Sequence, residues 1–312
     1  GRLERWNHSF ERVEQLEDMI QQIVSKINRV VNVSRPIADA RLVEDGSRVH
    51  IVLPPIALDG PVVTIRKFPE PITIERLIQY GSLTREAADF LGKLVKSGYN
   101  IFISGGTGSG KTTILNAMSG YIPQEERVIT IEDSAELQIR HVTNLVSLET
   151  RVENRDGSQE ISMRDLIRAS LRMRPDRIIV GEVRGDEALE MLQAMNTGHD
   201  GSLSTGHANS AKDMLSRLET MVLMAAELPL AAVRSQIGSA LDLMVHVGRM
   251  RDRSRKVLEI TEVIGYENGE IRLSPIYQFQ ESGEAGSGQV EGALVQVGRF
   301  EGRRRFAGGS AF

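Results

Sequence analysis

The sequence predicts an α/β fold, a mostly parallel sheet with helices on its faces, preceded by a smaller α+β unit. From residue 101 onward, short apolar runs alternate with segments of helical periodicity. Before residue 68, one helical pattern is followed by short alternating runs. The stretch Phe68-Pro69-Glu70-Pro71 separates the two parts, because each proline disfavours helix before it and removes a backbone donor.

Bulk composition limits the function classes. The 312 residues are enough for two domains, and the formal net charge of -4 argues against a nucleic-acid partner. The absence of cysteine excludes disulfides and thiol chemistry. No run of about 18 apolar residues suggests a membrane span, and no signal peptide precedes the first polar helix. Because the chain opens within charged sequence, we expect it to be a fragment of a longer protein.

The first domain is expected over residues 1–70. Apolar residues from Phe10 to Val31 recur at three- and four-residue steps, which predicts an amphipathic helix over 9–31. Three strands should follow, at 38–44, 48–53 and 61–68. Residues 71–82 are expected to be a linker.

The second domain is expected over residues 83–280. It should open with a helix that Thr84 caps and that ends near residue 97. Further strands are predicted at 127–132, 146–150, 177–183, 202–205, 243–247, 257–266 and 270–279, with helices at 163–173, 186–195 and 211–225. Asn268-Gly269 predicts a hairpin between the last two strands. Residues 281–312 are expected to be flexible or irregular, because they begin Gly/Ser/Glu-rich and end with little periodicity around Arg303-Arg304-Arg305.

The most specific stretch is NIFISGGTGSGKTT, residues 100–113. A short apolar run predicts a buried strand, a glycine segment fits G-x-x-x-x-G-K-[ST], and a helix follows. Loop amides and a helix N-terminus bind phosphate, so we predict ATP binding here. Lys111 should reach the β- and γ-phosphates, and the Thr112 hydroxyl should bind Mg²⁺. The predicted nucleotide-binding residues are Gly105, Gly106, Thr107, Gly108, Ser109, Gly110, Lys111, Thr112 and Thr113.

Two predicted strands end in carboxylates, Glu132-Asp133 and Glu182. Open α/β sheets keep their active sites at the carboxyl ends of strands. Glu182 stands where a loop-type NTPase places its second metal-contacting acid. Because it is Glu rather than Asp, we expect it to act on Mg²⁺ through a water. The alternative for both stretches is a solvated strand end, and the loop motif upstream favours function.

Histidines and arginines leave more than one interpretation. His199 and His207 flank the strand at 202–205 and could sense the γ-phosphate, make structural hydrogen bonds or bind a metal, although no ligand cluster accompanies them. An arginine is needed to stabilise the transferred phosphoryl group, and it can come from another domain or subunit. The residues alone do not select it.

Four motifs in order, GGTGSGKTT, ITIEDSAEL, RIIVGEVRG and NTGHDGSLSTGHANS, resemble the Walker A loop, Asp box, Walker B and His box of the type II/IV secretion ATPases. Their wording is most similar to the tight-adherence pilus branch, the CpaF/TadA-like ATPases. The resemblance covers about residues 30–266. The long N-terminal extension usual in that branch is missing, and the segment beyond Phe279 does not align.

The resemblance implies a RecA-like ATPase core under a mobile N-terminal domain. It implies a homo-hexamer, cytoplasmic and peripheral at the inner membrane, that contacts an inner-membrane platform protein and pilin or secretion machinery. By position, Glu132 matches the acid that orients or deprotonates the attacking water, and Glu182 the Walker B acid. His199 and His207 match the His box, and Arg48 and Arg66 are the candidate arginine fingers.

We therefore expect an ATP-hydrolysing motor that powers pilus assembly or protein secretion. One alternative is an ATPase of the same family with a different function, either DNA transfer of the conjugation type or pilus retraction. Another is an ATP-sensing assembly module with little turnover. Phosphate release would separate the motor from the module, and salt-dependent DNA binding would favour DNA transfer.

Overall fold

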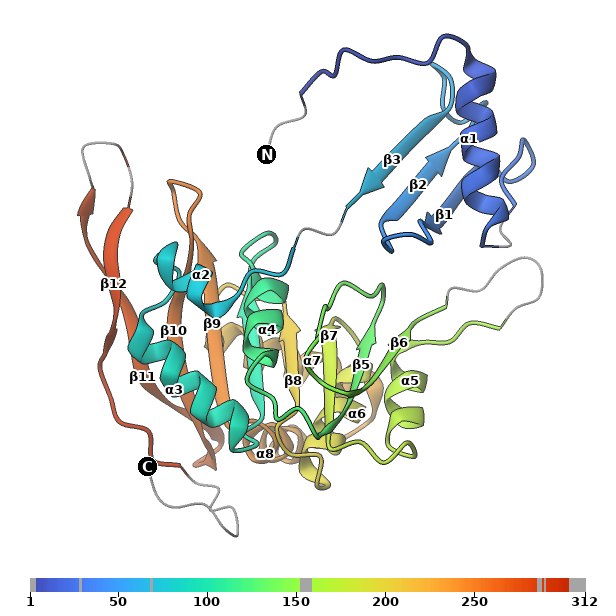
Figure 1. Cartoon of the computed structure of the whole chain (residues 1–312). Helices are drawn as coiled ribbons and strands as arrows, with labels where there is room; N and C mark the ends of the chain where they lie inside the picture. Colours follow the sequence, from blue (N-terminus) through green and yellow to red (C-terminus); the bar gives the residue numbers. More distant parts are fainter. Residues whose placement is uncertain are drawn as a thin grey trace. The chain divides into compact units, whose positions relative to one another are not determined.

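The chain folds into two compact units, Gly1–Glu70 and Pro71–Phe312. The computed structural model describes residues 4–27, 30–67, 70–151, 159–284, 288 and 290–302. Figure 1 shows a small antiparallel sheet with one helix in the first unit, and a large mixed sheet between helices in the second. This is the predicted fold class.

The first unit is a three-stranded antiparallel sheet covered on one face by a helix. Its elements are α1 (Val13–Ser25), β1 (Ile37–Arg41), β2 (Arg48–Val52) and β3 (Val62–Arg66). Ile20 and Val24 of the helix pack on Val49 and Ile51 of the central strand. The helix is shorter than predicted. The amphipathic pattern continues into the turn that follows, because Val31 is buried in the same core although it lies outside the helix.

The second unit is built on a nine-stranded sheet of order β12-β11-β10-β9-β4-β8-β7-β5-β6. Its strands are β4 (Ile101–Gly105), β5 (Arg127–Glu132), β6 (Asn144–Glu149), β7 (Arg177–Val183), β8 (Leu203–Gly206), β9 (Leu243–Arg249), β10 (Arg255–Glu267), β11 (Glu270–Glu284) and β12 (Val290–Gln296). The strands from β9 to β6 run parallel, so their carboxyl ends share one edge of the sheet. The last three strands of the chain extend the sheet antiparallel.

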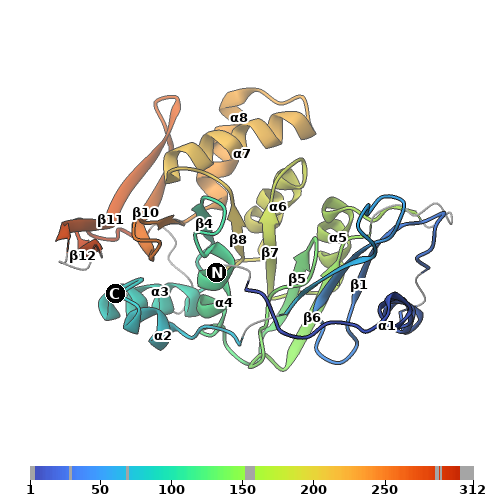
Figure 2. The ribbon, with the colours of Figure 1, turned by 90° about the horizontal axis from the view of Figure 1, so that it is seen from above.

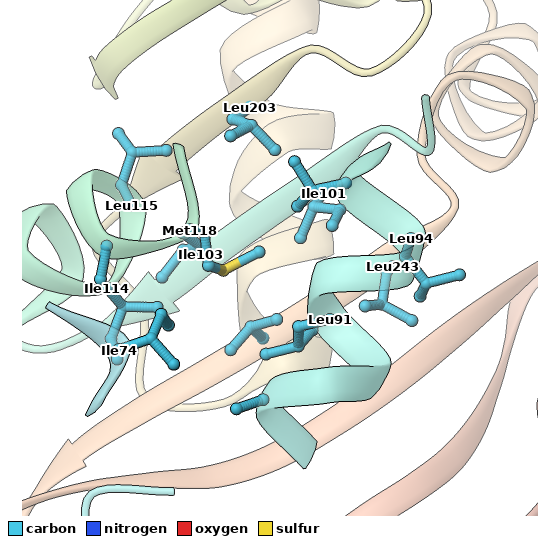
Figure 3. Packing of buried hydrophobic residues seen from close by; sticks show 14 of the residues in the cluster. Ile74, Leu91, Leu94, Ile101, Ile103, Ile114, Leu115, Met118, Leu203 and Leu243 are labelled. Atoms are coloured by element: carbon cyan, nitrogen blue, oxygen red, sulfur yellow. The ribbon is translucent and has the colours of Figure 1, made fainter. Parts of the chain in front are cut away.

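Helices cover both faces of this sheet (Figure 2). The helices are α2 (Ile74–Gln79), α3 (Arg85–Lys96) and α4 (Lys111–Ser119) on one face, and α5 (Met163–Ser170), α6 (Glu187–Asn196), α7 (Ala211–Ala225) and α8 (Leu230–Ala240) on the other. Because strand side chains alternate, Ile101 and Ile103 face the first layer and Phe102 the second. Figure 3 shows Leu91 and Leu115 packed around these isoleucines.

A buried asparagine joins the amino ends of three adjacent strands. Asn100, just before β4, donates its backbone N–H to Asp242 Oδ2 at 2.8 Å and its side-chain N–H to Ala240 O at 2.8 Å. Its Oδ1 accepts from Ser202 N at 3.0 Å. Asp242 and Ser202 precede β9 and β8. These bonds fix the register of β8, β4 and β9.

Two helices were not predicted. The short α2 lies inside the expected linker over 71–82, where the Thr73 hydroxyl caps it by accepting from Arg76 N and the apolar side chains Ile74 and Leu77 are buried. The second, α8, begins directly after Pro229, since proline suits a helix start. Short or proline-led helices leave too little periodicity to detect.

The expectation of an irregular segment from residue 281 is wrong for its described part. Strand β11 continues to Glu284 and pairs with β12, whose Val290 and Leu294 are buried. Backbone pairing and these two side chains outweigh the flexible composition of the segment. Arg303-Arg304-Arg305 lies outside the described residues. The predicted helix over 163–173 ends earlier, at Ser170, and Arg174 just beyond has a positive φ of 56°.

Candidate active site at the carboxyl edge of the sheet

The glycine loop lies between β4 and α4, as the sequence predicted. Gly110 is the N-cap of α4 with φ 99°, a conformation that favours glycine. The loop residues Gly106, Thr107 and Gly108 are exposed, whereas Lys111 is largely buried. The loop is therefore open to a ligand and stands at the positive end of a helix.

Three side chains from adjacent strands meet beside the loop. The order β4-β8-β7 places Lys111, His207 and Glu182 at neighbouring positions on the carboxyl edge. Lys111 Nζ donates to Gly106 O at 3.1 Å and lies 3.3 Å from His207 Nδ1. His207 Nε2 lies 2.5 Å from Glu182 Oε1. The structure thus brings together the loop lysine, the Walker B acid and one of the two predicted histidines.

Charge in this group follows from burial. Burial lowers the pKa of Lys111, with a smaller opposing effect from Glu182. Burial, and then the Lys111 ammonium, lower the pKa of His207 although Glu182 opposes this. The contact with Lys111 fits a neutral imidazole whose Nδ1 accepts from the Lys111 ammonium, and Nε2 lies against the Glu182 carboxylate.

Arg184 connects the two acidic strand ends. Its guanidinium donates from Nη2 to Glu182 Oε2 at 2.5 Å and from Nη1 to Asp133 Oδ2 at 3.0 Å. Glu182 therefore lies between Arg184 and His207. The sequence reading singled out neither Arg184 nor its bridging contact. The arginine stands two residues after the Walker B acid, but only the strand order brings Asp133 to it.

Glu132 is held at the end of β5. Its Oε1 accepts backbone N–H bonds from Glu136 at 2.9 Å and Leu137 at 3.1 Å, and the residue is buried. Its side chain packs on the neighbouring strand at Gly181, where a Cβ would lie only 2.7 Å from Glu132 Cγ. Glycine at 181 is therefore required for the position that Glu132 takes.

We expect Gly181→Ala to displace Glu132, lower turnover at least about tenfold, and cost about 1–3 kcal/mol of stability through overpacking. Gly185→Ala is the matched control, because it adds the same methyl group at a site whose nearest neighbour is Glu187 Oε2 at 3.2 Å and not Glu132. Phosphate release and thermal unfolding measure the two effects. Equal activity of both variants would show that the Gly181 contact does not position Glu132.

A cleft of about 340 Å³ adjoins the loop. Ser109, Gly110, Thr113 and Ile114 line its loop side. Its other walls come from α2 and the β9–β10 hairpin, and the apolar residues among them are Ile72, Leu77, Val247 and Val257. An apolar cleft that opens beside a phosphate-binding loop has the character of a site for a flat, mostly apolar group attached to phosphates.

The remaining predicted residues lie elsewhere. His199 precedes β8 and lies at the amino end of the strand, while His207 follows its carboxyl end. The His199 backbone N–H and its ring Nδ1 both contact Ala194 O, at 3.4 and 3.3 Å. This placement supports a structural role for His199 and does not bring it to the loop. The expected catalytic role has no geometric support.

Arg48 and Arg66 belong to the first unit. They are register partners across β2 and β3, and Arg41 of β1 pairs in register with Arg48. The three arginines therefore form one row across the sheet, on the face away from the buried Val49. Arg41 was missed, because only the strand register reveals that it belongs to this row.

Taken together, the open loop, its lysine and the acids at neighbouring strand ends define a nucleoside triphosphatase of the phosphate-loop class. A family model described as "Type II/IV secretion system protein" matches residues 4–276. The chain belongs to this family and is an ATPase of it.

Relatives agree with this assignment. Conjugal transfer protein TrbB of Rhizobium radiobacter is 36% identical over 269 residues, which cover 85% of this chain and 79% of that protein. Type IV secretion system protein PtlH of Bordetella pertussis (strain Tohama I) is 36% identical over 258 residues, 72% of this chain and 74% of that protein. The VirB11 ATPase from the Brucella suis type IV secretion system, solved in complex with sulphate, is 32% identical with a TM-score of 0.51 and covers 79% of this chain and 80% of that one.

The comparisons confirm the predicted fold class, the ATPase activity and the secretion ATPase family. They favour the type IV secretion and conjugation alternative over the pilus-assembly reading, because these relatives carry conjugal-transfer and type IV secretion names. The finer assignment to the tight-adherence pilus branch receives no support from them.

Proposed function

We propose that this chain is the ATP-hydrolysing motor of a type IV secretion or conjugation machine. One observation carries the proposal, namely that Lys111, His207 and Glu182 converge beside an open phosphate-binding loop while Glu132 ends β5, the strand next to that of Glu182. The family match and the names of the relatives support the assignment to a type IV secretion or conjugation machine.

The loop and its helix hold the nucleotide. Backbone amides of residues 105–113 and the N-terminus of α4 bind the phosphates, and Lys111 exchanges His207 for the β- and γ-phosphates. The cleft beside Thr113 and Ile114 accepts the base. Since burial lowers the pKa of Lys111, negatively charged phosphates would provide a favourable environment for its charge.

Mg²⁺ fits the donors that the structure presents. Thr112 lies in the first turn of α4, and the Glu182 carboxylate lies on the other side of Lys111 and His207. Mg²⁺ usually combines one or two protein oxygens with phosphates and waters. Because Glu182 is already bound by Arg184 and His207, a water between Glu182 and the ion suits the site better than direct contact. The ion would neutralise charge on the phosphates.

Glu132 acts on the attacking water. A carboxylate at the end of β5, fixed by two backbone amides and by the surface of Gly181, is a positioned general base. Arg184 pairs with both Asp133 and Glu182 at the neighbouring strand ends and is a positioning residue.

The arginine finger comes from the row of the first unit, in the same chain or a neighbouring subunit. We expect Arg48→Ala or Arg66→Ala to lower kcat by about 10³-fold or more while ATP binding persists, because a finger acts on charge that develops during transfer. Arg41→Ala tests the third member of the row. Arg35→Ala, outside the sheet, is the control. If none of the three row variants changes kcat, the finger lies elsewhere.

Assembly and location remain proposals from the family. A homo-hexamer, cytoplasmic and peripheral at the inner membrane, would bring a finger from one subunit to the loop of another and contact a membrane platform protein. Among the described helices, none is both long and apolar enough to cross a bilayer. Membership of the tight-adherence branch, with pilin as cargo, rests on the wording of the four motifs alone.

The deciding experiment measures phosphate release by the purified chain with Mg²⁺ and ATP, with and without lipid vesicles. Turnover supports the motor, whereas ATP binding without turnover under any condition favours an ATP-sensing assembly module. DNA binding measured at several salt concentrations tests the separate prediction that nucleic acid is not a direct partner.

A further inference from the structure

The β9–β10 hairpin carries an unusual concentration of positive charge beside the loop. Arg249, Arg251, Arg253 and Arg255 occur within seven consecutive positions. Arg249 and Arg255 are direct register partners, and like charges placed opposite each other on a sheet destabilise it. An arrangement that costs stability calls for a compensating ligand or partner.

Arg253 adds a second cost. The hairpin closes with the bonds Met250 N to Ser254 O at 2.8 Å and Arg253 N to Met250 O at 2.9 Å. Arg253 takes φ 69° in this three-residue loop, at the position that usually holds glycine. A non-glycine residue in a strained turn next to a binding cleft points to a functional side chain.

Arg253, with its positive φ, and Arg255, which lies opposite Arg249, both lie at the proposed nucleotide site. Arg253 and Arg255 line the cleft beside the loop, and Arg255 Nε donates to Gly108 O at 2.9 Å. Arg251, by contrast, pairs with Glu281 of β11. Within the described part of the chain, no carboxylate pairs with the side chains of Arg253 or Arg255.

We infer that Arg253 and Arg255 form an anion subsite for the α-phosphate of the bound nucleotide. This rests on the proposed function, in which Lys111 and the loop hold the outer phosphates and the cleft holds the base. The α-phosphate links those two parts, and both arginines line the cleft that adjoins the loop, with Arg255 in contact with Gly108 O. Planar guanidinium groups suit phosphate oxygens, and a bound phosphate offsets the repulsion between Arg249 and Arg255.

The test measures ADP affinity by calorimetry at low and high salt, together with thermal unfolding of the ligand-free chain. Arg253→Gly should weaken ADP binding about tenfold and flatten its salt dependence, yet raise Tm by about 1–2 °C because glycine relieves the positive φ. A merely structural residue would lower stability when replaced. Arg255→Ala should weaken ADP binding by a similar factor.

Arg251→Ala is the matched control, since it removes the same charge from the same turn but its side chain points to Glu281. Its ADP affinity should stay within about twofold of the wild type. Unchanged ADP binding by Arg253→Gly and Arg255→Ala, or an equal loss in Arg251→Ala, overturns the subsite. If the wild-type chain binds ADP and Lys111→Ala does not, the proposed function survives that result. If the wild type binds no ADP, the proposed function itself fails.

Discussion

Glu132→Gln is expected to lower ATP turnover by about 10²–10⁴-fold while ATP binding remains. Glutamine keeps the oxygen that accepts the N–H bonds of Glu136 and Leu137, so the fold around the strand end should persist. It cannot take a proton from water. Steady-state phosphate release gives the turnover, and calorimetry with ATP under slow-turnover conditions gives the affinity.

Asp133→Asn is the matched control for this change, because it neutralises the adjacent carboxylate and weakens only the exposed pair with Arg184. Its turnover should fall by much less, about tenfold at most. If Glu132→Gln hydrolyses ATP at the wild-type rate, the base is another group. If both variants lose activity equally, the effect belongs to the charge of the strand end as a whole.

Lys111→Ala is expected to weaken ATP binding at least about a hundredfold and to abolish turnover, because contacts from a largely buried ammonium to phosphate are charge-assisted. The wild type should also take up protons when ATP binds at alkaline pH. Burial lowers the pKa of Lys111, and the negative charge of bound ATP raises it again. Calorimetry in two buffers of different ionisation enthalpy measures that uptake.

Lys93→Ala on the exposed side of α3 serves as the control for Lys111→Ala, since it removes one exposed ammonium that lies outside the loop motif. It should bind ATP as the wild type does. Proton uptake that persists in Lys111→Ala, should it still bind ATP at high concentration, would assign the titration to another group.

The parts of the site that could be predicted are those that depend on residues close together in the sequence. The loop at 105–112 is one continuous motif, and the strand over 127–132 and the helix over 211–225 have the predicted bounds. The pairing of Arg184 with Asp133 joins residues 51 positions apart, and the Arg255 contact with Gly108 joins residues 147 apart. Such contacts follow from strand order, which no local periodicity encodes.

The same limit explains His199 and Gly181. The sequence places two histidines around one short strand, but a strand has two ends, and only its carboxyl end reaches the loop. The need for glycine at 181 is likewise not visible in the local sequence, because it arises from the contact with Glu132 on the adjacent strand. The resemblance names Glu132, Glu182, His207 and His199 together, and the strand order places the first three at the carboxyl edge of the sheet and His199 at the amino end of its strand.

The bonds of Asn100 have a consequence at the other end of the molecule's main sheet. Parallel strands tied at one end cannot slide past one another, so the height at which Lys111 and His207 emerge is decided a full strand length away from them. A leucine in place of Asn100 would keep the backbone bond to Asp242 but leave Ala240 O and Ser202 N without these bonds, and we expect the damage to appear as misaligned catalytic groups. Remote loss-of-activity variants in this chain should therefore cluster around that anchor as well as around the loop.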